Sequence, residues 1–276
     1  MTAPSQELHF ADAGEAADLA AFLARLIHYD RAAAVRLQAG GGVLAVFGRP
    51  PSFEVLAIRT ARLEAIVSTE AAPDTPHMSA GAGALDTTVS AGEFADALDT
   101  ARAARTADGP EGRDRGGRGL VVTVPQAVTG PPWAGVLPPR GGWRRVNGLP
   151  GVNEVRGAVA AAVAEFRARD AALPEERRTR AERDRIGHEI WSRTLGDTGL
   201  PLRAVHAAQS LGFLHPVRAA APAATAHGSG VATAAPEPLA LLAAGGWLRL
   251  RTPYGSIAVR TSGLAGGLSG LSVSPA

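Results

Sequence analysis

The sequence predicts an α+β fold made of two related halves, each an antiparallel β-meander or hairpin with packed helices. Near both ends of the chain, a helical pattern precedes short β-type runs that glycine turns separate. With 276 residues, 46% of them hydrophobic, the chain has room for one large domain or two of ordinary size and enough apolar residues to bury a core. We expect an acidic N-terminal half over residues 1–125, a connector rich in Pro, Gly and Trp over 126–151, and a basic C-terminal half over 152–276.

Two similar stretches, far apart in the chain, predict an internal repeat. Residues 242–261 can be laid over residues 37–60. Two glycines and a leucine coincide in this overlay, with Gly41, Gly42 and Leu44 on Gly245, Gly246 and Leu248. When three residues are dropped from the turn that follows, residues 57–60 fall on 258–261. Glycine turns between alternating strands also arise by convergence, so true duplication and convergent patterning both stay open.

The N-terminal half reads as a helix followed by a meander. A short strand precedes a helix whose apolar residues recur at helical spacing, and three further strands follow, separated by glycine and proline turns. Ser90 with Glu93 forms a capping-box pattern that predicts the start of a second helix. The expected strands lie at residues 6–10, 35–38, 43–47, 53–59 and 120–124, and the first helix at 11–29.

The C-terminal half reads as three helices followed by a hairpin. Apolar residues at helical spacing predict helices over 152–170, 173–195 and 201–214, and alternation predicts the hairpin at 242–261. Three further segments are rich in Ala, Pro and Gly, with little apolar side chain to bury: residues 69–84, 106–118 and 219–238. We expect these three segments to be mobile.

Composition excludes several kinds of chemistry. The chain contains no Cys, which removes disulfides, thiolate nucleophiles and Cys-ligated metals. It contains no Lys either, which removes Schiff-base catalysis and phosphate-loop lysines. The pI of about 9.8 is high because the 28 arginines do not titrate near neutrality. The net charge is only +2, so the pI says little about binding partners. The charge is unevenly divided, at −5 over residues 1–125 and +7 over 126–276.

No catalytic or metal-binding motif is complete. Residues 187–191, GHEIW, begin like a zinc-protease helix, but Ser192 stands where the second histidine would have to be. His206 and His215 are nine residues apart, a spacing without specificity for a metal. We therefore assign no catalytic residue, no metal ligand and no cofactor.

The candidate binding residues are tryptophans and arginines of the connector and the last hairpin. An arginine without a nearby acid can contact an anion, and an indole can supply a stacking face. The set is Trp133, Arg140, Trp143, Arg144, Arg145, Arg249 and Arg251. Two plainer interpretations stay open. The two tryptophans can pack an ordered crossing between domains, and Arg249 and Arg251, which alternate with leucines, can form the solvent face of a half-buried strand.

These observations leave three function classes. The first is a noncatalytic binding or regulatory protein, of unknown ligand, that acts through contacts with a protein partner. The second is a nucleic-acid-associated protein that uses the basic half, although a winged helix would need its recognition helix in residues 215–230, where prolines and glycines disfavour one. The third is an enzyme with a dispersed polar site.

The expected location is cytoplasmic. No signal-peptide pattern and no run of about 18 apolar residues occurs, so we expect a soluble protein that does not enter a membrane. Oligomeric state is left open by the sequence.

Overall fold

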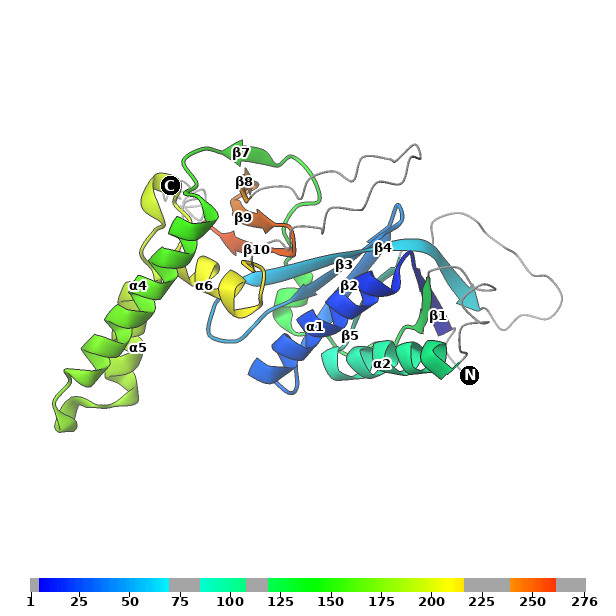
Figure 1. Ribbon diagram of the computed structural model, residues 1–276, viewed down its shortest axis with the longest axis horizontal. Helices are drawn as coiled ribbons and strands as arrows, with labels where there is room; N and C mark the ends of the chain where they lie inside the picture. Colours follow the sequence, from blue (N-terminus) through cyan, green and yellow to red (C-terminus); the bar gives the residue numbers. More distant parts are fainter. Residues whose placement is uncertain (1–4, 70–84, 108–118, 216–238, 262–276) are drawn as a thin grey trace, which may run out of the picture. The chain divides into compact units, whose positions relative to one another are not determined.

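The computed structural model describes residues 5–69, 85–107, 119–215 and 239–261 (Figure 1). The fold is α+β with antiparallel sheets, and the described residues contain five α-helices. The chain separates into two compact units, Met1–Leu137 and Pro138–Ala276, which we call unit 1 and unit 2. Each unit is described by itself.

Unit 1 is a six-stranded antiparallel sheet with two helices. Its strands lie in the order β5-β2-β3-β4-β1-β6. The long strand β4 pairs with β3 through its first half, up to Arg62, and with β1 from Leu63 onward. In chain order the elements are β1 (Ser5–Phe10), α1 (Ala13–Tyr29), β2 (Ala34–Gly40), β3 (Val43–Gly48), β4 (Leu56–Thr69), β5 (Leu85–Ser90), α2 (Ala91–Ala107), β6 (Leu120–Thr123) and the 3-10 helix η1 (Pro132–Gly135).

Helices α1 and α2 lie side by side against this sheet and close the core of unit 1 (Figure 1). The side chain of Asp12 caps α1 by accepting the amide of Gly14 at 2.8 Å. The apolar stripe of α1 is buried, and the helix packs on α2 and on strands β4 and β1. Arg59 of β4 also reaches α1, where its guanidinium pairs with Asp18 at 2.6 Å.

Unit 2 combines a four-stranded antiparallel sheet, in the order β10-β9-β8-β7, with three helices. The helices α4 and α5 run side by side as a helical hairpin, and α6 packs on α4, on α5 and on β10 (Figure 1). The elements are β7 (Arg144–Val146), α4 (Val152–Ala171), η2 (Glu175–Arg177), α5 (Arg180–Trp191), η3 (Gly196–Thr198), α6 (Leu202–Ser210), β8 (Ala240–Ala244), β9 (Trp247–Thr252) and β10 (Gly255–Arg260).

Both segments of the expected repeat form antiparallel meanders, with the same first turn. The turn residues Gly41 and Gly42 have φ of 60° and 75°, and Gly245 and Gly246 have φ of 50° and 75°. Both pairs adopt the left-handed conformation that a tight two-residue hairpin requires and that glycine adopts without strain. The first part of the overlay therefore matches the strand geometry.

The second part of the overlay needs a correction of three residues. Arg62 pairs opposite Val43 and Arg260 opposite Trp247, so Arg62, and not Arg59, corresponds to Arg260. The connection after the second strand explains the error, because it is longer in unit 1 by six residues rather than by three. Duplication of the two halves stays a prediction.

Three further differences from the sequence-based elements have local causes. Strand β4 begins at Leu56 rather than at residue 53, because Ser52 and Glu54 have φ of 70° and 52°, which a strand cannot contain. Strands β5 and β7 were not expected, since the apolar residues of β5 do not alternate regularly with polar ones and β7 has only three residues. The segments expected to be mobile lie outside the described residues, except for Thr69 in β4 and residues 106–107 in α2.

Candidate functional site

One face of the unit 2 sheet gathers most of the arginines that the sequence singled out. Residues that pair across antiparallel strands place their side chains on the same face. Arg145 of β7 pairs with Leu242 of β8, which pairs with Arg249 of β9, so both arginines lie on one face. Arg251 follows two residues after Arg249 and shares that face, as does Arg260, which pairs with Trp247. We call this surface the arginine face. Its members are Trp143, Arg145, Trp247, Arg249, Arg251 and Arg260.

The opposite face of the same strands holds the core of unit 2. Leu248 and Leu250, which alternate with the arginines of β9, are 7% and 0% exposed. Phe213, after α6, packs directly against the backbone of Gly255. Because the helices cover this side, the alternation of β9 leaves its arginines on the other one.

Trp143 and Arg249 form the centre of the arginine face. The Arg249 guanidinium carbon lies 5.7 Å from the centre of the Trp143 ring, a cation–π contact. The indole Nε1 of Trp143 donates to the carbonyl oxygen of Pro139 at 3.0 Å, which fixes the ring above the strand. A second contact of this kind joins Arg260 to Trp247 at 5.4 Å.

Arg249 is a half-buried cation with an unsatisfied donor. Its Nε is inaccessible to solvent and has no hydrogen-bond partner within the described part of the chain. Burial lowers the pKa of the guanidinium from its usual value, although an arginine keeps its charge at neutral pH. Strands β7 to β10 contain no Asp or Glu, so none of these four strands supplies a carboxylate to balance the charge.

The remaining candidate residues divide between other places. Arg144 projects from β7 to the face opposite Arg145. Arg140 is exposed in the segment that precedes β7. Trp133 belongs to η1 of unit 1, whereas the other six candidates belong to unit 2.

Two members of the arginine face were missed by sequence reasoning, Trp247 and Arg260. The alternation of β9 contains the signal for Trp247, since it stands two residues before Arg249. Arg260 could be placed only with the correct pairing of β9 and β10, which the overlay of the two halves had shifted.

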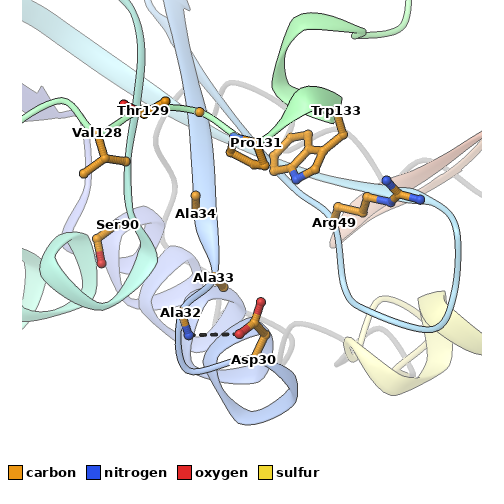
Figure 2. Close-up of a pocket in the computed structure, with 11 residues that line it drawn as sticks. Asp30, Ala32, Ala33, Ala34, Arg49, Ser90, Val128, Thr129, Pro131 and Trp133 are labelled. Atoms are coloured by element: carbon orange, nitrogen blue, oxygen red, sulfur yellow. Dashed lines mark hydrogen bonds between the residues drawn. The ribbon is translucent and has the colours of Figure 1, made fainter.

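Trp133 lines a pocket of about 450 Å³ in unit 1 (Figure 2). The turn between α1 and β2, the end of β5 and the segment 128–133 surround it. Its polar side chains come from Asp30, Arg49, Ser90 and Thr129, and Figure 2 shows Arg49 and Trp133 beside one another.

His206 and His215 of unit 2 do not share a site. His206 of α6 stacks on Trp191 of α5, with the ring centres 4.3 Å apart, and burial lowers its pKa. His215 contacts the carbonyl oxygen of Gly212 through Nδ1 at 2.6 Å. Within the described residues, no three side chains of His, Asp or Glu lie close enough together to hold a metal ion.

Comparison with known families divides the chain at nearly the same place as the structure does. Residues 3–135 match a family model described as a domain of unknown function (DUF8010), and residues 138–264 match a second one, also described as a domain of unknown function (DUF8185). No curated protein and no solved structure matches the chain. Among the helices of the described segments, none combines the length and hydropathy needed to cross a membrane.

Proposed function

We propose that this protein is a noncatalytic binding protein and that its arginine face binds single-stranded nucleic acid. The observation that carries the proposal is the Trp143–Arg249 pair, a half-buried cation stacked under an indole on strands without a carboxylate. Such a pair combines the two elements from which sequence-tolerant nucleic-acid sites are built, positive charge and an aromatic stacking surface.

The charges of the face favour an anionic partner. Arg249 keeps its charge although it is half-buried, and a bound anion beside it would balance that charge. Hydrogen bonds between guanidinium and phosphate are charge-assisted and stronger than neutral ones. The exposed side chains of Arg145 and Arg260 extend the positive charge across the sheet, over about 14 Å for four strands.

The tryptophan favours nucleic acid over an acidic protein. A protein segment rich in Asp and Glu would satisfy the arginines but would make no special use of Trp143. An unpaired base can stack on the indole and on a guanidinium plane, which contributes about 1 to 3 kcal/mol per base. The bases of a duplex are already stacked on one another, so the proposal includes a preference for single strands.

Binding of three fluorescent probes by the full-length protein tests this proposal: a 12-nucleotide single strand, the same sequence as a duplex, and polyglutamate of similar charge. The expected order of affinity is single strand, then duplex, then polyglutamate. Trp143→Ala should weaken binding of the single strand by about 5- to 150-fold and leave polyglutamate binding nearly unchanged.

A matched pair of double variants separates the arginine face from general positive charge. Arg145→Gln with Arg249→Gln removes two charges from the face, whereas Arg156→Gln with Arg167→Gln removes two exposed charges from α4. Only the first pair should weaken binding of the single strand. Equal losses in both pairs, or tighter binding of polyglutamate than of the oligonucleotide, would overturn the nucleic-acid proposal, and the second result would point to an acidic protein partner.

A further inference from the structure

We propose that the unit 1 pocket binds a small zwitterion of the amino-acid class, with its carboxylate toward Arg49 and Trp133 and its ammonium group toward Asp30. The inference concerns unit 1 alone and does not depend on the nucleic-acid proposal. At about 450 Å³, the pocket falls in the range of about 300 to 1,000 Å³ that small-molecule sites occupy.

One end of the pocket offers hydrogen-bond donors. Arg49 follows β3 and has an exposed side chain, and no acid within the described ranges pairs with it. Trp133 is half-buried beside it, and its indole N–H donates to no acceptor in the part of unit 1 that the structure describes (Figure 2). The indole N–H is therefore available to donate to a ligand in the pocket. A carboxylate has oxygens for both groups, since it accepts bidentate contacts from an arginine.

The pocket also contains a negative charge at a separate place. Asp30 ends α1, and its Oδ1 accepts the amide of Ala32 at 2.9 Å, which holds the carboxylate in a fixed position. Figure 2 shows Asp30 in the turn below, apart from Arg49 and Trp133. A ligand with only an anionic group would leave the charge of Asp30 without a partner. A ligand with only a cationic group would leave the charge of Arg49 without one. A zwitterion matches both ends.

The segment that carries Trp133 is fixed to the sheet rather than loosely attached. The amide of Val128 donates to the carbonyl oxygen of Thr88 in β5 at 2.9 Å. Gly130 then passes so close to Thr88 that a Cβ at this position would lie 3.1 Å from the hydroxyl oxygen and 3.3 Å from Ala134. A fixed wall means that less conformational entropy is lost when a ligand binds.

The test begins with a panel of the twenty common amino acids, added at millimolar concentration to the full-length protein and followed by isothermal titration calorimetry. At least one should bind. The tightest ligand is then compared with its N-acetyl derivative, which has no ammonium group, and its carboxamide, which has no carboxylate. Each derivative should bind at least about tenfold more weakly, since each removes a charge-assisted hydrogen bond.

Two variants assign the two ends of the ligand. Arg49→Gln should weaken binding of the free amino acid about tenfold and leave the carboxamide unaffected, and Asp30→Asn should do the same with the N-acetyl derivative. The Asp30→Asn change keeps a side-chain oxygen that can accept from the amide of Ala32, so the turn is preserved. Arg31→Gln is the control, because Arg31 is an exposed arginine next to Asp30 that does not line the pocket.

Three results would overturn this inference. The first is that no amino acid of the panel binds. The second is that the blocked derivatives bind as tightly as the free amino acid. The third is that Arg49→Gln weakens the free amino acid and the carboxamide equally while circular dichroism shows a folded protein, because the carboxylate would then not contact Arg49.

Discussion

The salt dependence of nucleic-acid binding is the sharpest quantitative consequence of the arginine face. Four arginines lie on it, Arg145, Arg249, Arg251 and Arg260. If each contacts one phosphate of a single strand, the slope of log affinity against log salt is about −0.7 per contact, or about −2.8 in total. Affinity should then fall about 50-fold between about 50 and 200 mM salt.

Removal of one arginine should change this slope by a known amount. Arg249→Gln leaves three contacts, a slope of about −2.1 and a fall of about 18-fold over the same range of salt. Fluorescence anisotropy with a labelled single strand, at five or more salt concentrations, measures both slopes. Arg156→Gln, an exposed charge on α4, should leave the slope at the value of the parent protein. A slope near zero in the parent protein, or the same slope in the Arg249 variant, would refute the assignment of phosphate contacts to these side chains.

Two further predictions concern stability. Gly48→Ala should destabilise unit 1 by about 1 to 3 kcal/mol, because the new methyl group overlaps the side chain of Leu26, whereas Gly40→Ala, with open space around it, should have little effect in urea unfolding. Glu189 pairs with Arg169 at 2.7 Å, and hydrogen bonding to this arginine lowers the pKa of Glu189 to about 2. Since the folded pKa lies below the unfolded one, the pair stabilises the folded state above about pH 4.5, and this contribution is lost as the pH falls toward 2. The melting temperature of Glu189→Gln should therefore lie below that of the parent at pH 7, and the gap should close on acidification. A gap that stays constant with pH would contradict this interpretation.

The sequence predicted elements well where a local pattern is sufficient. The stripe of α1, the Ser90 cap of α2 and the glycines of both meander turns all act within a few residues of themselves, so periodicity and backbone chemistry identify them. Pairing between strands is different, because it depends on the length of the connection that separates them. The overlay of Arg59 on Arg260 failed for this reason.

The candidate site was predictable in composition but not in arrangement. The sequence shows that no Asp or Glu stands near the arginines of the last hairpin, and alternation placed Arg249 and Arg251 on one side of a strand. Nothing local indicated that Arg145 pairs into the same row of the sheet, since β7 is separated from β8 by three helices. Trp133 and Trp143 are ten residues apart in one connector, yet they belong to different units. The sequence did not show that the boundary between the units falls between them.

The double pairing of β4 has a consequence for how unit 1 opens. One uninterrupted strand of 14 residues hydrogen-bonds to β3 along its first half and to β1 along its second, so unfolding of β4 disrupts both parts of the sheet. Amide protons along both halves are therefore expected to exchange with solvent through the same rare global opening. Because β1 and β4 are joined by more than 40 residues of intervening chain, and β1 and β6 by more, these pairings close long loops, and we expect them to slow the folding of unit 1.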